Sequence, residues 1–372
     1  MPTVGWTEYF GKTVWVTSGV ATQDETTSGA LQQLSRVQSL NWDIAYPLQD
    51  QVYLDGGVDS YNPVAPEVNV TVDFLHTQAS NERYLGLGKW DSSGNWVLGL
   101  DDERNMYVSF EDEQGHDSIG APRIAPRTVL GLAQGVLTSY QLSAAVGGLI
   151  QSRATLNYLT ASIYSGASGE ATAAINPHNG NALTGRFVIP TPSAQYVSST
   201  GVTLESTVAL GAREMTMMFP ANSPFGIVFT GQQACFLQSM QLGVSINRTA
   251  VKPLGYAYPP ERPAMWPIQV DLNTEAIVGK YQVDRLRRLQ CTVTGQAIFV
   301  AIKQPCSATT VFGFYFTDMQ MVGQSFGATI GGADTVTTNW RGFLRSPSDT
   351  FLSPFWSTII RLDTSGEWGT SW

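Results

Sequence analysis

The chain has 372 residues, of which 14% are charged and 43% are hydrophobic, and it contains 36 glycines. A disordered chain has more charge and fewer aromatic residues, so this composition argues against disorder and is typical of a protein dense in strands and turns. The formal net charge of −9 excludes a broad basic surface for gripping nucleic acid, although an acidic wall would let nucleic acid pass without adhering.

No feature of the sequence points to secretion or to a membrane. The N-terminal segment MPTVGWTEYFGKT lacks the basic start and the long apolar run of a signal peptide. No stretch approaches the roughly 18 apolar residues of a membrane-spanning helix. Cys235, Cys291 and Cys306 lack metal-ligand spacing, so we expect buried free thiols in a reducing cytoplasm. We therefore expect a protein that is made and assembled inside a cell, without membrane contact.

The first half of the chain predicts two strands that are joined by a long loop and followed by a helix. Val68, Val70 and Val72 alternate with polar residues, which is the period of a half-buried strand. The loop before this strand, residues 46–66, is rich in proline, glycine and tyrosine. A helix is expected over residues 75–87.

The same pattern recurs 200 residues further along the chain. Ile268, Val270 and Leu272 again alternate with polar residues. The same offset aligns the segment Gln38-Ser39-Leu40 with Gln238-Ser239-Met240, without a gap. Recurrence of a strand, a long loop and a second strand in one order indicates an internal duplication.

The second repeat predicts a second loop and a second helix. The loop spans residues 247–266 and carries several prolines and aromatic residues. The helix is expected over residues 274–289, with Thr274 as its N-terminal cap. Beyond the helices the offset changes, but residues 128–132 still correspond to residues 310–314.

These repeats predict a mainly β protein with two tandem copies of one fold. The first copy covers residues 1–165 and the second covers residues 205–372. Residues 166–204 are rich in glycine, alanine, asparagine and serine, which is typical of a linker or a long loop. Each copy is expected to have a flanking helix and a long arm between two strands.

The two long loops, here named the first arm (residues 46–66) and the second arm (residues 247–266), are the candidate functional segments. Loops of about twenty residues without structure of their own are unusual and tend to be functional. Proline stiffens such an arm, and large aromatic side chains supply rigid contact area. We expect each arm to lie across a neighbouring subunit; the alternative is a loop that folds back on its own domain. The expected inter-subunit contact residues are Tyr53, Tyr61, Tyr256, Tyr258 and Trp266.

No catalytic, cofactor-binding or metal-binding residues are predicted. Ser325 lies in a G-x-S-x-G segment, but a hydrolase elbow needs a strand-to-helix turn and a later histidine, and no histidine follows His178. The acidic residues between 101 and 117 lack the spacing of a calcium loop. The three histidines are not closely spaced, which argues against a zinc site. We therefore expect a protein that is not an enzyme.

The repeated strand–arm–strand–helix pattern resembles phage tail-tube (major tail) proteins, especially those whose chain carries the tube fold twice. The resemblance rests on the segments LQSMQLGVSINRTAVKPLGYAYPPERPAMWPIQVDLNTEAIV (237–278), VLTSYQLSAAVGGL (136–149) and QSFGATIGG (324–332). In the N-terminal copy Pro47 stands where the second copy has Asn247, so the pattern departs there.

The resemblance implies a structural virion protein. Each copy would be a tail-tube-like β-sandwich or half-barrel, and the inner strands would join into one barrel across subunits. Three chains would form a pseudo-hexameric ring, and rings would stack around an acidic channel through which DNA passes without specific binding. Partners would be other copies of the chain and the tape-measure, tip or terminator proteins, in a virion tail assembled in the host cytoplasm.

Two alternatives remain open at the level of the sequence. A tail-tip hub or adaptor ring also uses duplicated tube folds. A carbohydrate-binding or depolymerising β-sandwich protein would use some of the ten tryptophans to stack on sugars.

Overall fold

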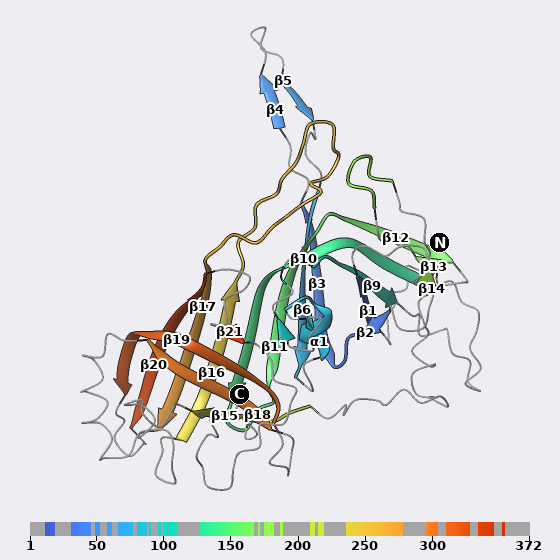
Figure 1. The fold of residues 1–372 in the computed structure, drawn as a ribbon. Coiled ribbons are helices and arrows are strands. Elements are labelled where there is room, and N and C mark those ends of the chain that lie inside the picture. The colour runs from blue at the N-terminus through green and yellow to red at the C-terminus, as the bar shows by residue number, and fades with distance from the viewer. Residues whose placement is uncertain are drawn as a thin grey trace, which may run out of the picture.

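The computed structural model describes the strands, one helix and several connections. The described residues are 12–18, 31–45, 49–52, 58–61, 66–76, 80–87, 89–90, 96–97, 100, 102–110, 127–166, 170–171, 175–181, 187–188, 209–212, 215–218, 236–277, 295–303, 310–327, 334–345 and 352–353. They form mainly antiparallel strands in an open sheet, with little helix (Figure 1). The predicted mainly β fold is confirmed.

Eight strands lie side by side in what we call the central sheet. They are β3 (Val37–Ala45), β6 (Glu67–Leu75), β10 (Arg127–Ala145), β11 (Gln151–Tyr158), β16 (Phe236–Ser245), β17 (Ile268–Ile277), β19 (Thr310–Gly327) and β20 (Thr335–Leu344). The spatial order is β3-β6-β11-β10-β16-β17-β20-β19, and every neighbouring pair is antiparallel. Numbered along the chain, each half therefore contributes its strands in the order first, second, fourth, third.

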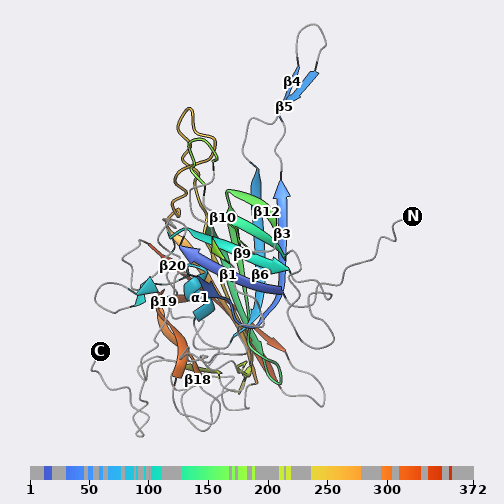
Figure 2. The same cartoon turned by 90° about the vertical axis from the view of Figure 1, so that its right-hand side faces the viewer.

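The long strands β10 and β19 leave the central sheet and enter a second layer. The first part of β10 pairs with β9 (Arg104–Phe110) and β12 (Thr160–Gly166), and β9 pairs with β1 (Lys12–Ser18), which also pairs with β2 (Gln32–Gln33). Figure 2 shows β1 and β9 crossing the strands behind them. The first part of β19 pairs with β18 (Gln296–Lys303) and β21 (Leu352–Ser353), and β18 pairs with β15 (Met215–Met218).

Among the described residues, three short strand pairs lie outside these layers. They pair β4 (Gln49–Val52) with β5 (Val58–Tyr61), β7 (Lys89–Trp90) with β8 (Trp96–Val97), and β13 (Glu170–Ala171) with β14 (Phe187–Val188). The β4–β5 hairpin belongs to the first arm, and β13–β14 belongs to the predicted linker.

Alternation of side chains explains why one face of the central sheet is buried. Val68, Val70, Val72 and Phe74 of β6 are at most 1% exposed, and the residues between them face the other side. One continuous core of buried apolar residues runs through both halves of the chain; it includes Leu142, Leu242, Leu272 and Trp340. The two halves therefore share a single core in addition to a single sheet.

Helix α1 (Ser80–Tyr84) lies within the predicted segment 75–87 but is shorter, since Leu75 is still in β6 and residues 85–87 form a turn. Its Glu82 is fully buried, and Tyr140 and Ser152 both donate hydrogen bonds to Glu82 Oε1, at 3.0 and 3.3 Å. His76 Nδ1 lies 2.9 Å from the same oxygen. Burial is the largest cause of a pKa of the Tyr140 hydroxyl well above its usual range. This polar cluster fastens α1 to the buried face of the central sheet.

The predicted helix over 274–289 is wrong at its start. Thr274 lies in β17, which continues to Ile277, and its hydroxyl is 2.6 Å from that of Thr338 on β20. The side chain is buried between strands and does not cap a helix. Residues 278–289 lie outside the described part of the chain.

The first strands of the two halves share an irregularity at positions 200 residues apart. The β3–β6 register shifts between Val37 and Ser39, and the β16–β17 register shifts between Leu237 and Ser239. After the shift, Ser39 lies opposite Asp73 and donates to it at 2.7 Å, whereas Ser239 lies opposite Glu275 and donates to it at 3.3 Å.

Candidate functional site

The unburied face of the central sheet, here named the polar face, is the first candidate. Its side chains alternate with the core residues and are mainly amides, hydroxyls and charged groups. Five carboxylates lie on it: Asp43, Glu67, Asp73, Asp271 and Glu275. The paired segments of the eight strands contribute two basic residues, Arg153 and Arg341. The polar face thus carries more negative than positive charge.

One row of directly opposed residues crosses the whole polar face. Read from β3 to β19, the row is Ser39, Asp73, Arg153, Gln141, Gly243, Asp271, Arg341 and Gln320. Across the strands, the order Asp–Arg–Gln therefore occurs twice in this row, once in each half.

Both arginines of this row are held by the aspartate on the adjacent strand. Arg153 donates to both carboxylate oxygens of Asp73, at 2.5 Å from Nε and 3.2 Å from Nη2. These hydrogen bonds are the largest cause of a lowered pKa of Asp73 and a raised pKa of Arg153. Arg341 Nε donates to Asp271 Oδ1 at 2.9 Å, and Gln269 donates to the other oxygen at 2.6 Å.

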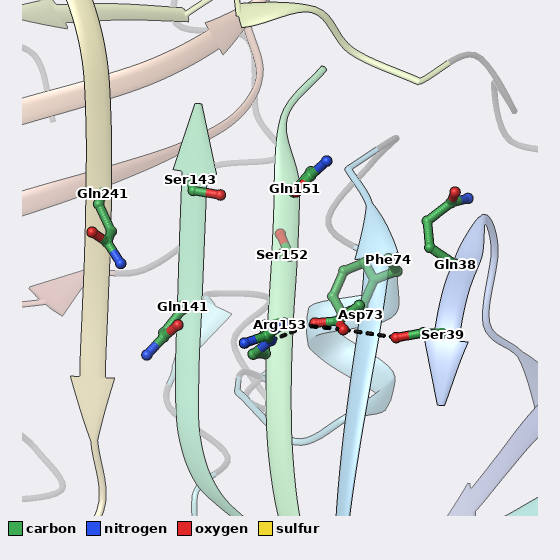
Figure 3. A pocket seen from close by; sticks show the side chains of 10 residues that line it. All are labelled: Gln38, Ser39, Asp73, Phe74, Gln141, Ser143, Gln151, Ser152, Arg153 and Gln241. Atoms are coloured by element: carbon green, nitrogen blue, oxygen red, sulfur yellow. Dashed lines mark hydrogen bonds and ion pairs between the residues drawn. The ribbon is translucent and has the colours of Figure 1, made fainter. Parts of the chain in front are cut away.

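A shallow hollow of about 400 Å³ lies on the polar face where β3, β6, β11, β10 and β16 run side by side (Figure 3). Gln and Ser side chains and the Asp73–Arg153 pair line most of it, and the buried Phe74 also contributes to its lining. Trp42 and Trp340, the tryptophans in the described central strands, sit at positions of the opposite, apolar face. The polar face therefore does not offer these tryptophans as platforms for a sugar.

The two edges of the central sheet leave large apolar side chains partly uncovered. Trp42 on β3 is 42% exposed and Phe326 on β19 is 45% exposed, and both occupy apolar-face positions. Trp42 makes an edge contact with Phe110, at a ring-centre distance of 6.0 Å. Unpaired strand edges with apolar side chains are templates for pairing with another chain.

Both arms project from the same end of the central sheet, which Figures 1 and 2 show at the top. The second arm is a narrow ribbon with isolated bridges between Arg248 and Ala264 and between Val251 and Glu261. At its tip Leu254 is fully exposed.

The second arm packs on the first half of the same chain through Tyr256 and Tyr258, which lie near its tip. Tyr258 contacts the buried cluster Ala133, Leu159 and Ile175, and its backbone N–H donates to Pro177 at 2.9 Å. The Tyr256 ring lies edge-on to His178, with ring centres 4.9 Å apart. Trp266 is half-buried against the main core.

Of the five predicted contact residues, the structure thus places Tyr256 and Tyr258 near the tip of the second arm and Trp266 at its base, each in contact with other parts of its own chain. Tyr53 lies outside the described residues, and Tyr61 is in β5 without a described side chain. Their inter-subunit role stays a prediction.

Two arginines that sequence reasoning missed fasten the second arm. Arg262 is 7% exposed, and its guanidinium donates to Asn157 O at 2.8 Å, to Gln134 O and to Glu103 Oε1 at 3.4 Å. Arg248 donates to the carbonyls of Leu137, Leu100 and Arg262. Burial is the main cause of a lowered pKa of Arg262 and a raised pKa of Glu103.

The backbone that receives Arg262 has an unusual local shape. Gln134 has a left-handed φ of 50°, and a Cβ on the next residue, Gly135, would lie 2.2 Å from the Tyr158 ring. Glycine is therefore needed at position 135, because any side chain would displace Tyr158. This irregularity in β10 presents the carbonyl of Gln134 to the arm.

The remaining candidates are the serine and the acidic and histidine residues that were considered above as catalytic or metal-binding groups. Ser325 lies inside β19, opposite Thr337, and not at a strand-to-helix turn. Within the described ranges, no group of three or more His, Cys, Asp or Glu side chains could hold a metal ion. No helix in that part of the chain is long and apolar enough to cross a membrane.

No family model matches this sequence, and no curated protein matches it at a significant level. The polar face, the two sheet edges and the arms are therefore the features from which a function can be inferred.

Proposed function

We propose that this chain is the structural subunit of a phage tail tube, in which copies join edge to edge into rings and the polar face lines the channel. The observation that carries the proposal is the repeated strand order of the central sheet, together with two edges, at β3 and at the second part of β19, with which no other described strand pairs. Because each half contributes the same order, the junction between β10 and β16 inside the chain is a template for a junction between β19 and the β3 of a second copy.

The stagger of the strands supports closure into a barrel. In this proposal the halves are copies of one fold, with Ser39 equivalent to Ser239. The row that starts at Ser39 nevertheless reaches β16 at Gly243, four residues beyond Ser239. A stagger of four residues over four strands, at about 3.3 Å per residue and 4.8 Å per strand, inclines the strands by about 35°, which is a common tilt in closed barrels.

The internal junction predicts the register of the junction between chains. Within the chain Leu142 faces Leu242, and Gln141 faces Gly243. The register of β10 also shifts, between Leu137 and Ser139, and that of β19 shifts between Met321 and Gly323. If these shifts are equivalent, Phe326 corresponds to Leu142, just as Trp42 of β3 corresponds to Leu242 through the shifts of β3 and β16. Phe326 would then face the Trp42 of the next copy, and Ser325 would face its Asp43. The aromatic pair would be covered on the apolar side, where hot-spot residues contribute about 2 kcal/mol or more.

Cysteine cross-linking tests this register. In a chain with Cys235, Cys291 and Cys306 changed to serine, Ser325→Cys and Asp43→Cys together should give linked oligomers, since opposed residues have Cβ atoms about 5 Å apart. Each change alone should give none. A matched control pairs Ser325→Cys with Asn273→Cys, which is exposed but lies inside the sheet. Linkage in the control, or none in the test pair, would contradict the proposed junction.

Negative-stain microscopy separates the wider alternatives. Hollow tubes are expected for a tail-tube subunit, assembled in the host cytoplasm and carried in the virion tail with tape-measure, tip or terminator proteins. Isolated rings would favour a tail-tip hub or adaptor ring instead. Monomers that bind sugars would favour a carbohydrate-binding β-sandwich.

A further inference from the structure

The charges of the polar face are not placed at random. Its two arginines lie 188 residues apart in the chain, yet each faces an aspartate on a neighbouring strand of its own half, directly across the β6–β11 and the β17–β20 pair. Just beyond the end of β20, Arg345 also lies near a carboxylate, at 3.6 Å from Asp318. By contrast Asp43 and Glu67 are exposed carboxylates with no ion pair among the described residues.

We infer that Asp73 and Asp271 mask Arg153 and Arg341, so that the polar face lets double-stranded DNA slide past it without holding the phosphates. This inference rests on the proposed function, because it takes the polar face as the wall of a DNA channel. A DNA phosphate gains affinity by releasing counterions when it meets a free cation. An arginine that already has a carboxylate beside it offers a net charge near zero, and the remaining carboxylates repel the phosphate.

The masking is electrostatic and does not hide the arginines from solvent. The Arg153 side chain is 56% exposed and that of Arg341 is 44% exposed, so DNA could reach either guanidinium. Exposed ion pairs contribute little to folding stability, typically below about 1 kcal/mol. Folding stability therefore explains little of why such a pair occurs twice. Masking does explain it, because the wall of a DNA channel should present no arginine that is free to hold a phosphate.

The test compares two double variants with equal charge. Asp73→Asn with Asp271→Asn removes both masks, whereas Glu67→Gln with Glu275→Gln removes two carboxylates from the same strands and the same face without freeing an arginine. We expect the first variant to bind a short fluorescent DNA duplex at low salt, about tenfold or more tighter than the second. Its binding should weaken with salt, with a slope of about 2 per chain for two phosphate contacts.

A second measurement keeps the result interpretable. Adding Arg153→Gln and Arg341→Gln to the unmasked variant should abolish DNA binding, because the freed guanidiniums are the phosphate ligands. Equal binding by the two double variants would overturn the inference in favour of net charge alone, and so would an unmasked, folded variant that binds no DNA. Negative-stain images of the same samples report tube formation separately, so a failure of the tail-tube proposal is distinguished from a failure of masking.

Discussion

At the scale of single residues, Arg262 joins the second arm to the first half of the chain. Its guanidinium reaches two backbone carbonyls of the first half and a carboxylate that is itself mostly buried. Burying a charge has a large desolvation cost, which is the main cause of the lowered pKa of Arg262, and only hydrogen bonds in good geometry offset it. The arrangement is therefore sensitive to the loss of any one member.

Replacing Arg262 should destabilise the folded chain strongly. Arg262→Met keeps much of the side-chain volume but leaves Glu103 and the carbonyls of Gln134 and Asn157 without their donor. We expect the free energy of unfolding to fall by about 3 kcal/mol, as for other buried charges that lose a partner. Urea denaturation followed by circular dichroism measures this change.

The matched control is Lys252→Met, which removes the same charge from the exposed part of the same arm. It should change the free energy of unfolding by no more than about 0.5 kcal/mol, as is usual for surface substitutions. Equal effects of the two substitutions would show that Arg262 acts only through net charge.

At the scale of elements, the sequence predicts strands well and their partners poorly. Alternation in Val68–Val72 and in Ile268–Leu272 follows directly from the two-residue period of a strand that is buried on one face. The error at Thr274 has a physical reason: the alternation of β17 continues through Ala276, and it outweighs a local capping signal. Long-range pairing overrides a local preference here.

The candidate site was predictable in part for similar reasons. Proline and tyrosine content marks both arms as unusual loops, but nothing near Arg262 in the sequence indicates its partners, which lie 105 to 159 residues away. The Asp73–Arg153 pair depends on the register between β6 and β11, which the whole sheet determines. Side-chain pairs across a sheet therefore become visible only with the fold.

The structure also sharpens the prediction for the second arm. Arg262 and Ala264 are buried, whereas Leu254 at the tip is fully exposed. Replacing residues 252–255 by two glycines removes Leu254 but keeps Tyr256 against His178, so it should leave the unfolding transition unchanged. It should still permit rings but prevent their stacking, because the exposed apolar tip would no longer reach the next ring. Circular dichroism and negative-stain microscopy measure the two effects, and stacks of normal length would contradict the role of the tip.

At the scale of the whole molecule, the decisive property is that the two edges of the sheet differ. The β3 edge carries Trp42 and the β19 edge carries Phe326, so copies can join only head to tail if these edges meet. Head-to-tail contacts generate closed rings when the rotation per copy closes, whereas a contact of like edges generates simple two-fold dimers. Ring closure also removes the unpaired edges that would otherwise promote aggregation.

Complementation between two edge variants tests this polarity. Trp42→Lys blocks the β3 edge and Phe326→Lys blocks the β19 edge, since a buried, unpaired lysine at the junction is costly. Each variant alone should sediment as a folded monomer. An equal mixture should form a dimer and nothing larger, because one β3 edge and one β19 edge remain available to meet. As a control, Phe343→Lys, on the polar face near the end of β20, should leave ring assembly unaffected. Rings formed by either edge variant alone, or a mixture that stays monomeric, would contradict a head-to-tail junction between β19 and β3.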